Sequence, residues 1–245
     1  MNNLYISKFW LSSPVPEDSY IAKLPVVKKL ADMGEFKFKK NVTFFVGENG
    51  CGKSTLLEAL AVRSKLNAEG GSRNYRFSTC STESDLCKYI TIAKSCYEKD
   101  SFFLRAESFY NVSSYILEKN LDLVTYGGKS LHDQSHGESF IALIQNRFWG
   151  NGLYILDEPE SALSPLRQIS LLVEIDRLVK KNSQLIIATH SPILTAYPEA
   201  DIYEIDEYGV TLKPYEETSN YLVTKQFLCD TEKILRELFD SGEKG

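Results

Sequence analysis

The chain has 245 residues, of which 43% are hydrophobic and 25% are charged, and its formal net charge is −5. This composition is typical of a globular protein, and the length is enough for one α/β domain with a sizeable core. A negative balance excludes binding to polyanions over the whole surface, so any contact with DNA must be local.

No run approaches 18 consecutive apolar residues, and the polar start at residues 1–3 does not begin a signal peptide. The five cysteines form no C-x-x-C pair, and one of them, Cys51, lies in a glycine-rich loop. An odd number of such cysteines favours a reducing compartment over a disulfide framework. We therefore expect a cytoplasmic protein with no integral membrane segment.

The N-terminal third begins with two predicted strands and a short helix. Residues 4–11 are mostly apolar and aromatic, which predicts a strand, and residues 26–33 predict a helix that Gly34 ends. Residues 35–40 alternate apolar and basic side chains, the pattern of a half-exposed strand. Its lysines are interpreted as a solvated face, with a contact to DNA as the less favoured alternative. Together the two strands predict a small antiparallel β element.

Residues 47–54 match the phosphate-binding pattern G-x-x-x-x-G-K-[ST] at every fixed position. An apolar run typical of a buried strand precedes them at residues 42–46, and helix formers follow at residues 55–62. In this context the loop binds phosphates with its backbone N–H groups, and a tight turn without a ligand is disfavoured. The predicted nucleotide-binding residues are Gly47, Glu48, Asn49, Gly50, Cys51, Gly52, Lys53, Ser54 and Thr55.

Two side chains of this loop have specific expected roles. Lys53 places a positive charge on the β- and γ-phosphates, and the Ser54 hydroxyl binds Mg²⁺. An aromatic residue of the antiparallel element is expected to stack on adenine, or else to belong to the core, and the sequence does not choose between these alternatives. The candidates are Phe9, Trp10, Phe36 and Phe38.

A helical insertion is predicted after a flexible break at residues 69–72. Residues 74–78 are consistent with an edge strand, and residues 82–99 show roughly helical spacing of their apolar positions. Residues 101–119 predict a short strand or turn followed by a helix. We find no internal repeat and no sustained heptads, so no coiled-coil arm is expected.

Three later segments carry polar residues in places suited to chemistry. Residues 134–138 (QSHGE) open a predicted helix, where a serine and a glycine expose N–H groups to an anion. Asp157 and Glu158 follow a buried apolar run, as a Mg²⁺ ligand and a general base do in phosphoryl-transfer enzymes. His190 ends a further buried run at residues 184–188.

Buried runs separated by helical patterns predict parallel strands, whose carboxyl ends meet at one edge of the sheet. Gly47, Asp157 and His190 are then expected at this edge. An amphipathic helix is predicted at residues 166–180, and the chain ends with a predicted hairpin at residues 201–213 and a helix at residues 221–239.

These motifs, in this order and spacing, resemble the ABC-type ATPases of the SMC/RecF-like branch, in a compact form without a coiled coil. Residues 47–54 resemble Walker A, 135–138 the signature motif, 157–158 Walker B with its catalytic glutamate, and 161–165 the D-loop, while His190 resembles the switch histidine. One feature departs from the family: no glutamine lies between Ser54 and Gln134, so no Q-loop residue is assigned.

The resemblance implies an α/β fold: a P-loop NTPase core with a mainly parallel sheet, a small N-terminal antiparallel β element and a helical insertion. One domain of residues 1–245 is expected, with its core at about residues 1–74 and 150–245 and a helical subdomain at about 75–149. Two copies would pair head to tail around ATP and Mg²⁺. The residues expected to reach the partner's nucleotide are Ser135, His136, Gly137 and Glu138.

The resemblance further implies hydrolysis of ATP, with Lys53, Glu158 and His190 as catalytic residues and Ser54 and Asp157 as Mg²⁺ ligands. The first hypothesis is a soluble switch ATPase that works with a partner effector, and possible contact with DNA, in DNA maintenance or anti-phage defence. The alternative is the energising subunit of a membrane transporter. A GTPase is disfavoured because the chain lacks an N-K-x-D motif.

Overall fold

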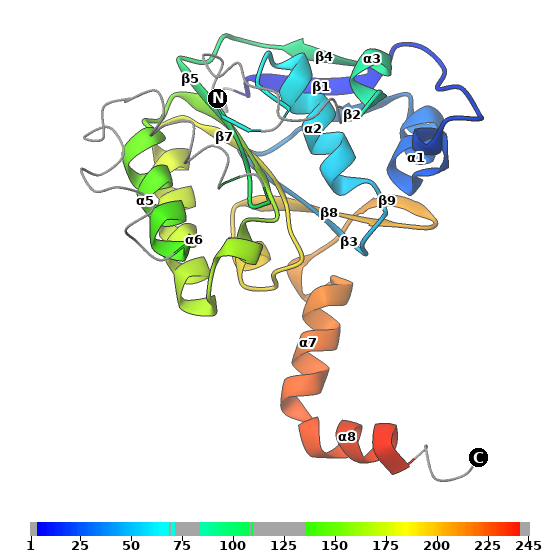
Figure 1. Ribbon diagram of the computed structural model, residues 1–245, viewed down its shortest axis with the longest axis vertical. Coiled ribbons are helices and arrows are strands. Elements are labelled where there is room, and N and C mark those ends of the chain that lie inside the picture. The colour runs from blue at the N-terminus through cyan, green and yellow to red at the C-terminus, as the bar shows by residue number, and fades with distance from the viewer. Residues whose placement is uncertain (1–3, 69, 72–83, 108, 110–135, 241–245) are drawn as a thin grey trace.

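The computed structural model describes residues 4–68, 70–71, 84–107, 109 and 136–240 (Figure 1). The strands are β1 (Ile6–Leu11), β2 (Glu35–Lys37), β3 (Val42–Gly47), β4 (Ile90–Lys94), β5 (Asp100–Arg105), β6 (Gly152–Asp157), β7 (Gln184–Ala188), β8 (Ala200–Asp206) and β9 (Gly209–Leu212). The α-helices are α1 (Pro25–Met33), α2 (Lys53–Arg63), α3 (Leu86–Tyr89), α5 (His136–Arg147), α6 (Pro165–Lys180), α7 (Ser219–Cys229) and α8 (Thr231–Asp240).

The main sheet has the strand order β5-β6-β7-β3-β8-β9 and is parallel except for the antiparallel pair of β8 and β9. Every residue of β3, β6 and β7 is buried, because both faces of the sheet are covered. The carboxyl ends of these three neighbouring strands lie side by side. The predicted α/β fold and the predicted placement of the three motif-bearing strands are confirmed.

The two faces of the sheet belong to two separate hydrophobic clusters. Phe44 of β3 packs in one cluster with α5 and α6, and the next residue, Phe45, packs in the other with α2. This alternation follows from the two-residue period of a strand. Consequently α2 covers one face of the sheet, and α5 and α6 cover the other (Figure 1).

A second sheet has the order β2-β1-β4 and is antiparallel. The predicted N-terminal β element is confirmed, although β2 is shorter than expected. The helical pattern read at residues 82–99 is wrong for β4, which pairs along β1 from Ile90 to Lys94. Pairing with a distant strand overrides local spacing in such short segments.

The interval predicted to be a helical insertion also contains β5, which pairs with β6 in the main sheet. Residues 90–94 and 100–105 are therefore strands of the two sheets, and not helices of a subdomain. Residues 74–78 and 110–135 lie outside the described residues, so the edge strand and the remaining boundaries of the subdomain stay predictions.

The C-terminal hairpin is confirmed as β8 and β9, but the closing helix is two helices, α7 and α8. Asp230 separates the two helices, because its φ of −125° and ψ of 34° lie outside helical geometry. Both helices extend away from the sheets (Figure 1). Figure 1 places the start of α7 below the carboxyl ends of the central strands.

One buried side chain joins the two sheets. Gln184, at the start of β7, is fully buried, and its amide donates to the backbone oxygen of Ile6 at 2.9 Å and accepts from the backbone nitrogen of Ile6 at 2.8 Å. The side chain thus replaces a strand partner for β1 at this position.

We predict that Gln184→Leu destabilises the protein by about 2–4 kcal/mol, since it leaves a buried N–H and a buried C=O of Ile6 unpaired. Urea unfolding followed by circular dichroism measures the change. Gln226→Leu, at an exposed position of α7, is the matched control and should stay within about 0.5 kcal/mol of the wild type. Equal stability of the two variants would contradict the role of Gln184.

Candidate nucleotide-binding site

The phosphate loop connects the end of β3 to the start of α2. Gly47 has φ +140°, and a Cβ there would lie 2.2 Å from the backbone oxygen of Ile205, so only glycine fits. Gly52 has φ +100°, and a Cβ there would lie 2.6 Å from a methyl carbon of Val26. The glycines therefore let the loop pass close to β8 and α1.

Lys53 is 4% exposed and lies inside the loop. Its ammonium donates to the backbone oxygens of Gly47 at 2.8 Å and Glu48 at 3.0 Å, and it lies 3.8 Å from the sulfur of Cys51. The thiol is buried as well. These contacts keep a positive charge at the centre of the loop.

Ser54 and Asp157 join the phosphate loop to the end of β6. The Ser54 hydroxyl donates to Oδ1 of Asp157 at 3.0 Å, and the carboxylate is 5% exposed. Burial raises the pKa of Asp157 to about 6, although the Arg105 guanidinium and the Ser54 hydrogen bond oppose this shift and Glu158 and Glu107 add to it. Arg105 and Ser54 therefore compensate the negative charge of Asp157 only in part. A buried carboxylate beside a hydroxyl supplies the oxygen ligands that Mg²⁺ prefers, so these residues fit the ion.

Glu158 and His190 face one another across the ends of β6 and β7. Oε1 of Glu158 lies 3.5 Å from Nε2 of His190, and both side chains are about one-third exposed. Glu158 has φ +48° and ψ 51°, a left-handed conformation that is uncommon for a residue with a side chain. Its backbone N–H still donates to Ala188 at 2.9 Å. The turn thus directs the carboxylate out of the sheet, toward the histidine.

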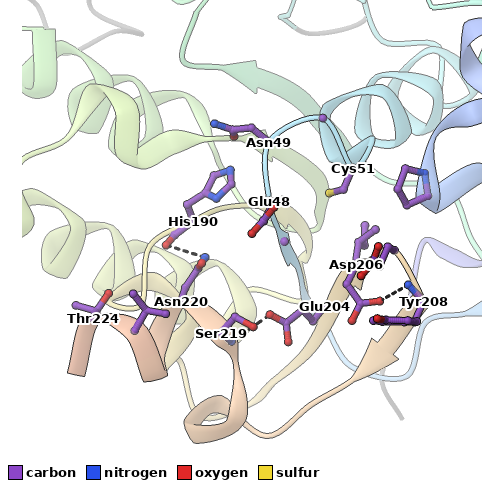
Figure 2. A pocket seen from close by; sticks show the side chains of 16 residues that line it. Glu48, Asn49, Cys51, His190, Glu204, Asp206, Tyr208, Ser219, Asn220 and Thr224 are labelled. Carbon is purple, nitrogen blue, oxygen red and sulfur yellow. Dashed lines mark hydrogen bonds between the residues drawn. The ribbon is translucent and has the colours of Figure 1, made fainter. Parts of the chain in front are cut away.

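Two residues without an assigned role hold the backbone of His190. Its N–H donates to Oε1 of Glu160 at 2.5 Å. Its carbonyl accepts from the amide of Asn220 on α7 at 3.0 Å, as Figure 2 shows. Glu160 belongs to the D-E-P-E segment, so the sequence offered a signal for it. Asn220 lies 30 residues after His190, and no sequence pattern links them.

Of the predicted signature residues, Ser135 lies outside the described residues and His136 begins α5. Gly137 packs tightly, since a Cβ there would lie 2.8 Å from Arg167 of α6, and Glu138 pairs with Arg167 at 2.8 Å. As α5 and α2 cover opposite faces of the sheet, the structure does not bring Gly137 and Glu138 to the phosphate loop of their own chain.

The aromatic candidates for adenine stacking are mostly excluded. Phe9, Phe36 and Phe38 are at most 5% exposed and pack on one another, so for these three the structure decides for the core and against stacking. Trp10 is half-buried, with the Lys8 ammonium 5.6 Å from its ring centre. Tyr208, which the sequence did not suggest, is 84% exposed.

A cavity of about 760 Å³ opens beside the phosphate loop (Figure 2). Gly47 to Cys51 and His190 line one part of it, and Tyr208 and Asn220 line another. The cavity therefore runs from His190 past the phosphate loop to the turn between β8 and β9 and to the start of α7. Its size suits a nucleotide.

Two family models match parts of the chain. One, described as "AAA domain", matches residues 27–85, and the other, described as "AAA domain, putative AbiEii toxin, Type IV TA system", matches residues 130–196. The first match contains the phosphate loop, and the second contains Asp157, Glu158 and His190. A curated protein of Haemophilus influenzae, named "Uncharacterized ABC transporter ATP-binding protein", is 27% identical over 202 residues, which are 74% of this chain and 76% of that protein.

Solved structures with similar folds include the SMC head domain from Thermotoga maritima, at 16% identity over 86% of this chain and 99% of that chain, with a TM-score of 0.42. They also include cbiO1 from Clostridium perfringens, part of the ABC transporter complex cbiONQ, at 20% identity over 79% of this chain and 86% of that chain, with a TM-score of 0.46. Both family models are described as AAA domains and match the segments that carry the predicted motifs, which is consistent with the predicted resemblance to an ABC-type ATPase. Within the part of the chain that the structure describes, no helix has the length and apolar character needed to span a bilayer.

The buried charge of Asp157 gives a testable pH dependence. Because burial raises its pKa from 3.8 to about 6, the native state binds the proton more tightly than the unfolded state, and stability falls as the pH rises through that range. We predict that Asp157→Asn, in EDTA, is more stable than the wild type at pH 8 and no more stable at pH 4.

Thermal unfolding at both pH values checks this difference, and adding Mg²⁺ at pH 8 should stabilise only the wild type. Glu207→Gln removes an exposed carboxylate from the turn after β8 and serves as the control. A wild type more stable than Asp157→Asn at pH 8 without metal would show that the carboxylate is already fully compensated.

Proposed function

We propose that this protein binds ATP and hydrolyses it to ADP and phosphate, with Mg²⁺ as cofactor. The observation that carries the proposal is that the carboxyl ends of β3, β6 and β7 lie side by side and bring the candidate residues together. Ser54 contacts Asp157 at 3.0 Å, and Glu158 faces His190 at 3.5 Å, beside a loop that encloses the Lys53 ammonium. Three segments far apart in the sequence thus supply a phosphate clamp, a metal site and a general base.

Each residue has a role that its surroundings support. Backbone N–H groups of the loop and the charge of Lys53 bind the phosphates. Ser54 and Asp157 hold Mg²⁺, which when bound neutralises phosphate charge. Glu158 orients the attacking water and accepts its proton, and His190, held by Glu160 and Asn220, stabilises the charge of the γ-phosphate.

We predict that Lys53→Ala weakens ATP binding more than about tenfold, because an ion contact to phosphate is lost. Glu158→Gln should retain binding and lose about 100-fold or more of the turnover, as expected for removal of a general base. Calorimetry with ATP and steady-state phosphate release separate the two effects. Lys180→Ala, on an exposed lysine of α6, is the control and should change neither. Hydrolysis by Glu158→Gln near the wild-type rate would remove Glu158 from the mechanism.

We further propose that two copies pair head to tail, each lending the start of α5 to the other's nucleotide. Two features support this arrangement. Gly137 and Glu138 begin a helix on the face opposite α2, and no described residue of α5 lines the cavity at the phosphate loop. Glu158 and His190 are partly exposed, so a second surface can cover them. ATP would join the copies through charge-assisted hydrogen bonds that ADP cannot make.

We predict that Glu158→Gln with Mg²⁺ and ATP is a stable dimer, and that adding Ser135→Arg abolishes the dimer while ATP binding persists. Multi-angle light scattering gives the mass, and calorimetry gives the binding. Ser170→Arg, on an exposed position of α6, is the control for the added charge. A mass that ATP does not change, and that Ser135→Arg leaves unchanged, would contradict the pairing.

We propose two candidate cellular roles. The SMC/RecF-like resemblance supports a switch ATPase that works with a partner effector and contacts DNA, if at all, only at a local patch. An energising subunit of a membrane transporter is the second candidate, because the curated relative from Haemophilus influenzae is named an ABC transporter ATP-binding protein. Affinity purification of Glu158→Gln with ATP separates them: recovery with integral membrane proteins supports the transporter, and recovery with soluble proteins or DNA supports the switch.

A further inference from the structure

Arg105 is the last residue of β5 and lies in register with Asp157 of the neighbouring strand. Its Nε lies 3.4 Å from Oδ2 of Asp157, the carboxylate oxygen that Ser54 does not contact. Among the described residues, Arg105 is the one cation within ion-pair distance of Asp157. The guanidinium therefore occupies one side of the candidate metal ligand.

The same guanidinium contacts two further carboxylates. Its NH1 donates to Oε2 of Glu58 on α2 at 2.9 Å, and its NH2 lies 4.0 Å from the exposed Glu107. Glu58 is buried, and its other oxygen accepts from the backbone N–H of Ser84 at 2.6 Å. Because Glu58 is fixed on the helix that follows the phosphate loop, Arg105 has a rigid anchor beside the metal site.

The charges around Asp157 do not balance. The Arg105 guanidinium, which is 21% exposed, lies within ion-pair distance of three carboxylates, and two of these are buried. A planar guanidinium is always charged and contacts two carboxylates at once, which a lysine ammonium does less well. Arg105 thus offsets part of the Asp157 charge and at the same time repels any cation that approaches this carboxylate.

We propose that Arg105 is a positioning residue that acts as the internal counter-ion of Asp157 and sets the affinity of the site for a divalent cation. This proposal rests on the proposed function, since it requires Asp157 to bind the metal. With the guanidinium in place, metal binds weakly until the phosphates of the nucleotide add negative charge. The arrangement couples metal binding to nucleotide binding.

The test measures metal binding without nucleotide, with Mn²⁺ as the probe and free Mn²⁺ determined by electron paramagnetic resonance. We expect Arg105→Gln to bind Mn²⁺ about tenfold more tightly than the wild type, because the repelling charge is gone. Arg105→Lys, which keeps the charge, should stay within about twofold of the wild type. Arg63→Gln, on an exposed arginine at the end of α2, is the control for a change in net charge.

A purely structural role for Arg105 predicts the opposite order, with weaker Mn²⁺ binding by Arg105→Gln, and that result would overturn the proposal. Unchanged Mn²⁺ binding by Arg105→Gln would overturn it as well. Should the glutamine variant fail to fold by circular dichroism, Glu58→Gln decides: it frees the guanidinium for Asp157 and should weaken Mn²⁺ binding, and tighter or unchanged binding contradicts the idea.

ATP binding in EDTA distinguishes this inference from the proposed function. ATP binding that depends on Lys53, together with Mn²⁺ affinities that Arg105→Gln does not change, would reject only the counter-ion role. A wild type that binds neither ATP nor Mn²⁺ would reject the proposed function and the counter-ion role with it.

Discussion

The contact between Ser54 and Asp157 is the interaction on which the rest of the site depends. It connects the first turn of α2 to the end of β6, two segments 103 residues apart in the sequence. The contact requires β6, β7 and β3 to be parallel neighbours, because only then do their carboxyl ends share one edge. The buried charge that results is unfavourable by itself, which accounts for the arginine beside it and for the proposal that a cation binds here.

Two further contacts connect this edge to the rest of the molecule. Gln184 ties the antiparallel sheet to the main sheet, and Asn220 ties α7 to the backbone of His190. A helix pair that extends from the body (Figure 1) is therefore hydrogen-bonded near its start to the backbone of the residue proposed to contact the γ-phosphate. In an ATP-dependent switch, such a contact gives a direct path from the site to a peripheral element, as ordered segments do in other switching proteins.

The errors of the sequence interpretation have a common physical cause. Residues 90–94 and 100–105 are short, and their burial depends on strands far away in the chain, so local periodicity was a poor guide. For Phe9, Phe36 and Phe38 the sequence left a base contact and the core open, and the packing of the three rings on one another decided for the core. Arg105 had no motif to mark it, because its role comes from strand register.

The sequence by itself determined which residues make up the candidate site, since the phosphate loop, the Asp157–Glu158 pair and His190 are each read from residue types within one short segment. It also determined that their strands are buried, and hence parallel, because continuous apolar runs need cover on both faces. Only the tertiary structure decided which charges surround Asp157, what holds His190 and which aromatic rings are buried. Those properties depend on contacts between residues tens of positions apart, and such contacts follow from sheet order and packing rather than from local pattern.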